Sequence, residues 1–449
     1  MSRELIESPR VVGSFFGIAV LLVVVRSVLE AATSLRAASE VCYISAQAFK
    51  YAEDAEMSHT SVQNVVLRIG LHELTRPKER AEDWIWMIDH TIQAGTTKCL
   101  IVLGIRHANY LAINRPLEHR DMQVLSLQPV EVSSGTIVEA QLEALVSQVG
   151  KPLSILSDRG SDLKKGVELL GEKHSGIISL YDIVHIVSRM SEKIMNADSR
   201  WPAYRQACCR CANATRQTTL AHMKPPTPKS KARYMHIDEE VRWGARSLAI
   251  LDQARNGKLS CEQKAQLSLD ELEKQLGWLD EYRQSLIQWE AITHIVKKSC
   301  RLVRTCGYGA ALQQRIAAEL GEWTDLTVSE LVKDIVTHCE QSSQLVGMRG
   351  RLPGSTEVLE SVIGKGKQLA GSHPIGSFTR QLLALASAVV TPTAEYVRAS
   401  LSTCRIKHLK RWCLENLPVS MQANRRRDLA PTEAEQKLRK QLSLQSPNF

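Results

Sequence analysis

The segment from Leu153 to Gly160 constrains the fold of this chain more than any other. It reads LSILSDRG, a short apolar strand that runs into Asp158 and a glycine turn, and a helix pattern starts at Ser161. In α/β proteins, catalytic and binding residues usually lie at the sheet edge formed by the C-terminal ends of such strands. The pattern therefore places the Asp158 carboxylate at a sheet edge, as a candidate metal ligand.

Strand and helix patterns flank this segment on both sides. Three strands that follow one another along the chain precede it, and the first two are joined by a hairpin-like connection. The expected order is strands at 84–90, 98–105 and 122–132, a helix at 135–148, the strand ending at Asp158, a helix at 161–171, a strand at 176–181 and a helix from Asp182. This order predicts an α/β fold with a mixed sheet, and it is similar to the order of the ribonuclease-H-like fold.

Asp89 lies in the first of these strands, in the sequence Trp-Ile-Trp-Met-Ile-Asp. An unpaired carboxylate among such apolar residues is costly unless a cation or a hydrogen-bond donor meets it. The alternative is an Asp that only opens the turn after the strand. In the ribonuclease-H-like fold the first strand carries one metal-binding acid and the fourth strand ends in another, and these positions correspond to Asp89 and Asp158.

A third acid candidate lies near the end of the chain. Pro353-Gly354 interrupts the preceding pattern, and Ser355 is the expected N-cap of a helix that contains Glu357 and Glu360. Glu360 and Lys367 are seven residues apart and so lie on one helix face, which suits a metal-binding carboxylate beside an ammonium group that contacts a DNA phosphate. For Glu357, an acid that complements the helix dipole in the first turn is a sufficient explanation.

The N-terminal part of the chain is expected to be helical. Residues 11–25 form the longest apolar run, about 22 Å as a helix, which is short of the roughly 30 Å core of a bilayer. A buried helix is therefore favoured over a membrane anchor or a signal peptide. Two further helices are expected at 33–41, with Ser34 as N-cap, and at 59–70.

The helix at 59–70 carries polar residues among apolar positions. Gln63, Asn64 and Arg68 would suit the second helix of a helix-turn-helix, from which side chains reach DNA bases. A small helical bundle with a solvated face fits the same stretch nearly as well.

The overall charge and the cysteines bound the type of protein. A net charge of +9 and a pI near 9.0 favour a polyanionic partner, with nucleic acid as the first candidate. Most of the 11 cysteines are single and scattered, which indicates a reducing compartment. The cluster at 208–211 lacks a second ligand pair, so ordinary helix positions are favoured there over a zinc site.

Taken together, the three acids and their settings resemble those of bacterial insertion-sequence transposases of the DDE type. The matching segments are Met87-Ile88-Asp89-His90, Leu156-Ser157-Asp158-Arg159-Gly160, and Ser355 to Glu360 with a lysine seven residues on. Asp182-Ile183-Val184-His185 resembles the C/D-x-x-H element that follows the second acid in this family, so Asp182 and His185 are supporting residues. The family also implies a helical insertion between the second and third acids, and the long interval from Asp158 to Glu360 fits one.

The resemblance implies an enzyme that binds the ends of a mobile element, cleaves the DNA there and transfers the strand to target DNA. It implies two Mg²⁺ or Mn²⁺ ions on Asp89, Asp158 and Glu360, and double-stranded DNA as partner, contacted by Lys367 and Lys365. It further implies a homodimer or larger assembly on DNA, in the bacterial cytoplasm at the nucleoid and without a membrane. The expected organisation is a helix-turn-helix-like domain at 1–80, a catalytic domain at 81–190 and 351–417, a helical insertion at 191–350 and a basic tail at 418–449.

Several alternatives remain open at the level of sequence. Glu290, in a stretch that imitates a related signature, and Glu357 are reserve candidates for the third acid. A decayed transposase that only binds DNA, or a ribonuclease-H-like nuclease without strand transfer, would carry the same patterns. A membrane-anchored protein that uses residues 11–25 is a further alternative.

Overall fold

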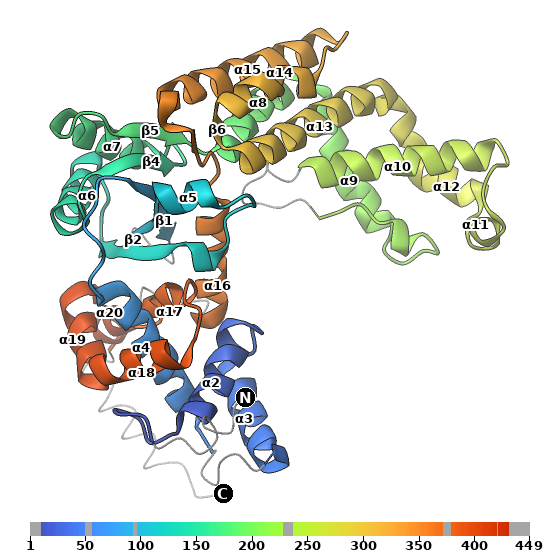
Figure 1. The fold of residues 1–449 in the computed structure, drawn as a ribbon. Helices are drawn as coiled ribbons and strands as arrows, with labels where there is room; N and C mark the ends of the chain where they lie inside the picture. The colour runs from blue at the N-terminus through green and yellow to red at the C-terminus, as the bar shows by residue number, and fades with distance from the viewer. Residues whose placement is uncertain are drawn as a thin grey trace, which may run out of the picture. The chain divides into compact units, whose positions relative to one another are not determined.

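The computed structural model describes residues 10–49, 56–92, 97–227, 237–370, 379–419 and 421–430, and these form two compact units (Figure 1). The first unit comprises residues 1–110, 117–177 and 356–449, and the second comprises 111–116 and 178–355. Most of the hairpin connection after the first strand, and most of the basic tail, lie outside the described residues.

Five strands form one mixed sheet, as the sequence predicts. They are β1 (Trp84–Ile92), β2 (Lys98–Arg106), β3 (Gln123–Val130), β4 (Pro152–Ser157) and β5 (Ile178–Tyr181). The strand order is β3-β2-β1-β4-β5, with β1 antiparallel to β2, β2 antiparallel to β3, and β1 parallel to β4. The short helices α5 (His107–Ala112) and η1 (His119–Asp121) lie between β2 and β3 along the chain.

Two helices cover one face of this sheet. These are α6 (Gly135–Val149), which begins at the N-cap Ser134 as predicted to within one residue, and α7 (Ser161–Lys173). Their apolar residues form one core with Trp84, Trp86 and Ile88 of β1. Residues 84–88 are all buried, although their side chains alternate between faces, so β1 is covered on both sides.

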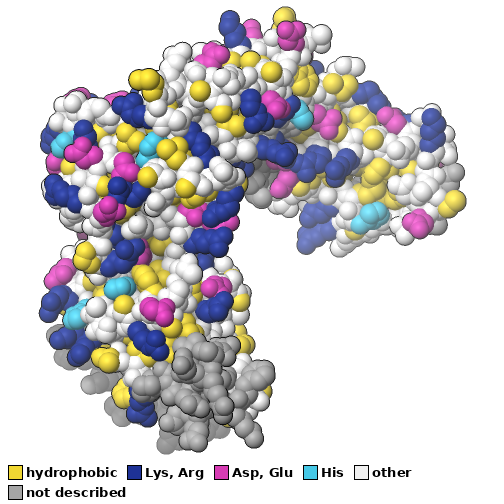
Figure 2. Space-filling view, viewed as in Figure 1, with side chains coloured by type: hydrophobic (Ala, Val, Ile, Leu, Met, Phe, Trp, Pro, Cys, Tyr) yellow, Lys and Arg dark blue, Asp and Glu magenta, His cyan; other side chains and the backbone are white. Residues whose placement is uncertain are grey.

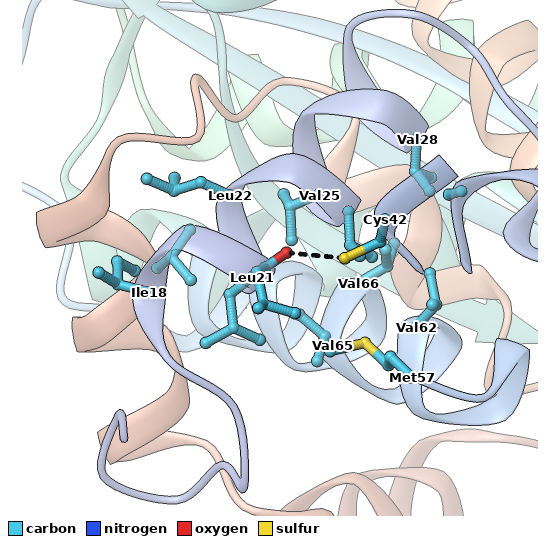
Figure 3. Close-up of a cluster of buried hydrophobic side chains, with 14 of the residues drawn as sticks. Ile18, Leu21, Leu22, Val25, Val28, Cys42, Met57, Val62, Val65 and Val66 are labelled. Atoms are coloured by element: carbon cyan, nitrogen blue, oxygen red, sulfur yellow. Dashed lines mark hydrogen bonds between the residues drawn. The ribbon is translucent and has the colours of Figure 1, made fainter. Parts of the chain in front are cut away.

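The apolar run near the N-terminus is a buried helix, as predicted, and it begins at Ile18. Helices α2 (Ile18–Leu29), α3 (Leu35–Phe49) and α4 (His59–Thr75) share a core in which Cys42 Sγ lies 3.9 Å from the Val20 carbonyl oxygen (Figure 3). Ser34 accepts a hydrogen bond from the Ala37 amide at the start of α3, as expected of an N-cap. Among the described residues, no helix is long and apolar enough to cross a membrane.

These N-terminal helices do not make their core alone, which differs from the expected separate domain at 1–80. Val397 and Leu401 of α18 (Ala394–Thr403) belong to the same core. A Cβ at Gly70 of α4 would lie 1.9 Å from the carbonyl oxygen of Leu383 in α17 (Leu382–Ser387), so α4 and α17 are in close backbone contact. We call this arrangement of α2–α4 with α17 and α18 the helical module, and α19 (Ile406–Asn416) contacts α4 within it. The chain continues to α20 (Met421–Asp428).

A buried carboxylate links the helical module to the sheet. Glu73 of α4 is only 2% exposed, and its carboxylate accepts hydrogen bonds from Arg76 Nε, Lys78 Nζ and Tyr396 Oη, each at 2.6 Å. Arg76 also donates to Gln123 at the start of β3. Burial lowers the pKa of Lys78 to about 8 despite the adjacent Glu73 carboxylate.

The second unit is mainly helical, and its two-residue strands β6 (Tyr308–Gly309) and β7 (Arg351–Leu352) were not predicted. Aromatic side chains at Trp201, Tyr204, Tyr282 and Trp289 contact one another inside it. Its helices are α8 (Ile183–Ala197), α9 (Arg200–Thr215), η2 (Ala221–Met223), α10 (Ile237–Arg255), α11 (Cys261–Gln266), α12 (Leu269–Leu276), η4 (Gly277–Tyr282), α13 (Arg283–Cys306), α14 (Ala310–Leu320), α15 (Leu326–Val346) and η5 (Gly347–Arg349). Cys208 and Cys211 are buried positions of α9, in agreement with the helix interpretation.

Candidate active site

The register of β1 and β4 aligns the first two acids. Met87 pairs with Leu156, the last pair of the parallel ladder, and β4 ends at Ser157. Continuing this register by two residues brings Asp89 level with Asp158, which is the first residue after β4. Neighbouring strands lie about 4.8 Å apart, and side chains alternate between faces. Both carboxylates therefore leave the sheet edge on the same face, opposite to the face where α6 and α7 cover Trp86 and Ile88.

The turn after β4 fixes the Asp158 carboxylate. Asp158 Oδ1 accepts a hydrogen bond from the Gly160 amide at 2.7 Å, and the intervening Arg159 has a φ of 66°. A left-handed conformation at a residue with a Cβ costs roughly 1–2 kcal/mol, and such strain is often found at functional sites. On β1, Asp89 Oδ1 accepts a hydrogen bond from the His90 amide at 2.6 Å. Each acid thus has one oxygen held by the local backbone.

Gly160 separates two carboxylates. A Cβ at this position would lie 3.1 Å from Asp158 Oδ1, which is closer than ordinary contact, and 3.4 Å from Asp162 Oδ1, which is at the limit of ordinary contact. A side chain at residue 160 would therefore push against the Asp158 carboxylate.

We expect Gly160→Ala to reduce metal-dependent activity by up to about a hundredfold, because a small displacement of a positioned reacting group has effects of that size. The melting temperature should change little, because Gly160 has a negative φ that alanine can adopt. Gly171→Ala on α7 is the matched control, since nothing lies within 4 Å of its added Cβ. Cleavage rates and thermal unfolding of both variants test this prediction, and equal rates for the two would contradict it.

Asp162 belongs to a second network that the sequence did not predict. Lys98 Nζ lies 2.8 Å from Asp162 Oδ2, and His90 Nδ1 lies 3.5 Å from the same oxygen. Burial by itself would raise the pKa of Asp162, but hydrogen bonds from Lys98 and Ser133 and the nearby charges lower it to about 2. Burial also lowers the pKa of His90. Asp162 is therefore an ionised carboxylate already matched by a lysine, whereas Asp158 has no Lys or Arg ion pair among the described residues.

The third acid is on α16 (Glu357–Ala370), which contacts β1. The carbonyl oxygen of Thr356 accepts a hydrogen bond from the Glu360 amide at 3.0 Å, so the N-cap is Thr356, one residue later than the predicted Ser355. Val358 and Leu359 are buried, and Glu360 is exposed. The side chain of Ser361 lies 2.9 Å from His119 Nε2 of η1, which holds the first turns of α16.

The three carboxylates share one part of the first unit without forming a closed ligand set. Within the described residues of that unit, no three His, Cys, Asp or Glu side chains bring ligand atoms within 4.8 Å of one another. The chemistry of the three carboxylates nevertheless fits a hard divalent ion, because Mg²⁺ and Mn²⁺ prefer carboxylate oxygens.

The supporting pair predicted at Asp182 and His185 lies together at the start of α8. Asp182 is 1% exposed and accepts a hydrogen bond from the Val184 amide, so it is the N-cap of this helix. His185 Nε2 lies 3.7 Å from Asp182 Oδ2. The D-x-x-H spacing thus places the histidine in the first turn of α8, next to the N-cap Asp182.

The residues that were predicted to contact DNA differ in their exposure to solvent. Lys367 is exposed, whereas Lys365 is half-buried and donates a hydrogen bond to the Ala388 carbonyl oxygen. Gln63 accepts a hydrogen bond from Arg380, and the Asn64 side-chain oxygen is buried with no hydrogen-bond partner among the described residues.

The prediction that Arg68 contacts DNA is wrong. It is 5% exposed, and its guanidinium group donates to the carbonyl oxygens of Gly13, Leu401 and Cys404. These bonds satisfy carbonyl groups at the end of α18. Arg68 thus joins both ends of the chain in the helical module and cannot reach a DNA base from this position.

The reserve candidates for the third acid are both exposed. Glu357 lies in the first turn of α16, beside Glu360, and Glu290 lies on α13 in the second unit. Exposure alone does not separate them from Glu360, but contact between α16 and β1 favours an acid on α16.

Comparisons with known proteins give structural similarities but no match of sequence family. No protein-family model matches the chain. No curated protein matches it either. Among solved structures, the chain is similar to the Drosophila P element transposase strand transfer complex, with a TM-score of 0.40 and 10% sequence identity, over 86% of this chain and 94% of that chain.

Proposed function

We propose that this chain is a DNA transposase of the DDE type, which cleaves DNA at the ends of a mobile element and joins those ends to target DNA. The observation that carries the proposal is the alignment of Asp89 with Asp158 across the parallel β1–β4 pair. Contact of the Glu360 helix with β1 supports it. The sequence resemblance to insertion-sequence transposases, from which the three acids were first chosen, agrees with this arrangement.

The carboxylates would act as ligands for two divalent cations. Bound Mg²⁺ or Mn²⁺ would supply Lewis-acid stabilisation of the scissile phosphate and of the attacking oxygen. Asp89 and Asp158 would hold the ions at the ends of neighbouring strands, and Glu360 would complete the ligand set from α16. Lys98 already balances the charge of Asp162, which leaves Asp158 for the cations. The exposed Lys367 would contact a phosphate of the bound DNA.

Two reactions at one site account for transposition. In the first, water attacks a phosphodiester at the element end, the P–O3′ bond breaks, and the products are a 3′-OH on the element and a 5′-phosphate on the flank. In the second, the new 3′-OH attacks a target phosphodiester, so one P–O bond forms as another breaks. The protein forms no covalent intermediate in either reaction. A homodimer or larger assembly on DNA, and association with the bacterial nucleoid, remain predictions.

The test uses the purified chain and DNA from both flanks of its coding sequence. A transposase is expected to produce 3′-OH ends at inverted repeats in that DNA, and to join them to a supercoiled target plasmid, only when Mg²⁺ or Mn²⁺ is present. Binding that is indifferent to divalent ions, with no cleavage under any condition, would support the decayed, DNA-binding alternative. Cleavage without joined products would support the nuclease alternative.

A further inference from the structure

The short helix α19 has two opposite faces of different chemistry. Leu409 and Trp412 are buried at 3% and 8% exposure, on the side that belongs to the helical module. Lys407, Lys410 and Arg411 are exposed at positions i, i+3 and i+4, so they lie together on the outer face. We call these three residues the α19 basic face. Dark-blue Lys and Arg side chains are visible over the α18–α19 region in Figure 2.

The charges of the α19 basic face are not balanced within the described part of the chain. None of Lys407, Lys410 and Arg411 makes a hydrogen bond or ion pair there. Glu415 is the one acid of α19, and it forms no ion pair with Arg411. Like charges three and four residues apart destabilise a helix by a few tenths of a kcal/mol per pair. An external anion would remove this repulsion.

We propose that the α19 basic face binds the phosphate backbone of duplex DNA, in place of the contact expected from α4. The three cations span about 6 Å along the helix axis. Duplex DNA presents a phosphate about every 1.7 Å of its axis when both strands are counted, so each cation can reach its own phosphate. Leu414, which is 86% exposed on the same face, offers no hydrogen bond to a base edge. The binding is therefore expected to be independent of base sequence.

This inference rests on the proposed function only for the identity of the polyanion. Two of the three contacts predicted from α4 are buried, namely Arg68 and the Asn64 oxygen, and the third, Gln63, is bonded to Arg380. This is a separate reason to look for the DNA surface elsewhere in the helical module.

The test is the triple variant Lys407→Gln, Lys410→Gln, Arg411→Gln in the full chain. Its affinity for a 30-base-pair duplex is measured in EDTA, where no cleavage occurs, at several salt concentrations. Loss of three phosphate contacts should reduce the slope of log affinity against log salt by about 2.7, and by the same amount for unrelated sequences. Glutamine keeps helix propensity, so the melting temperature should not change.

The control variant is Lys258→Gln, Lys274→Gln, Lys333→Gln, which removes the same charge from exposed positions scattered over the second unit. Its salt slope should stay within about one of the parent, because a general loss of charge is not a loss of defined contacts. An unchanged salt slope in the α19 variant would overturn the inference. A variant that lost affinity for single-stranded RNA but kept its affinity for duplex DNA would overturn it as well. Because binding is measured without divalent ions, a chain that binds through α19 but never cleaves would refute the proposed function alone.

Discussion

Asp158→Asn is expected to reduce Mg²⁺-dependent cleavage of element-end DNA by three orders of magnitude or more, while DNA affinity stays within about twofold. The substitution keeps the size of the side chain and its acceptor oxygen for the Gly160 amide, so the turn after β4 should remain. It removes the negative charge that a divalent ion requires. Metal ions contribute several kcal/mol of transition-state stabilisation, and each 1.36 kcal/mol corresponds to a factor of ten in rate.

The measurement is single-turnover cleavage of a labelled duplex, with binding measured in parallel in Ca²⁺ or EDTA. Asp89→Asn should give a loss of similar size, because its carboxylate occupies the equivalent position on β1. Glu172→Gln, at an exposed position of α7, is the control and should cleave at the parental rate. Parental cleavage by the Asp158 variant would end the proposed mechanism.

The same assay decides which glutamate is the third acid. We expect Glu360→Gln to abolish cleavage, whereas Glu357→Gln and Glu290→Gln should cleave at rates close to that of the parent. Loss of cleavage in one of the reserve variants, with an active Glu360 variant, would move the third ligand there and leave the first two assignments intact.

Glu73→Ala is expected to lower the free energy of unfolding by about 3–5 kcal/mol, the usual range when one partner is removed from a buried ion pair. The Glu73 carboxylate is the common acceptor for Arg76, Lys78 and Tyr396, and the variant leaves all three donors without it. Lys78 has a side chain only 5% exposed and would become a buried charge with no carboxylate beside it. Thermal and denaturant unfolding, followed by a probe in the first unit, measure the effect.

The matched control is Glu30→Ala, which removes an exposed acid from an ion pair with Arg26 and should change stability by less than about 1 kcal/mol. Burial of Glu73 opposes its ionisation, but hydrogen bonds and charges from Arg76 and Lys78 lower its pKa below the ordinary value. Its contribution is therefore fully present above the unfolded pKa near 4.5, and is lost as the pH falls through the folded pKa. A Glu73 variant as stable as the Glu30 variant would show that the network is not a stabilising link.

Strands and helices were largely predictable because their patterns depend on residues close together in sequence. The apolar runs at 84–90 and 98–105, the cap residue Ser34 and the helix pattern at 135–148 indicate elements that the structure contains to within a few residues.

The structure differs from the predicted separate domain at 1–80 for a physical reason. Amphipathic spacing shows that α2, α3 and α4 have apolar faces, but it does not show which partner covers them. In the structure the missing partners are α17 and α18, more than 300 residues away. Arg68 is buried and donates to carbonyl groups at the end of α18 and of Gly13. A polar residue on a helix therefore looks the same in sequence whether it faces solvent or a buried set of carbonyl groups.

For the candidate active site, local patterns were enough to place Asp89 within a strand and Asp158 directly after one, because a strand, an acid and a glycine turn are local features. The folded structure adds that these strands are parallel neighbours, that α16 contacts β1, and that Lys98 and His90 lie beside the Asp162 carboxylate. Those facts depend on contacts between residues 64 or more positions apart. Such contacts are selected by the total burial and charge balance of the folded unit, which no window of sequence contains.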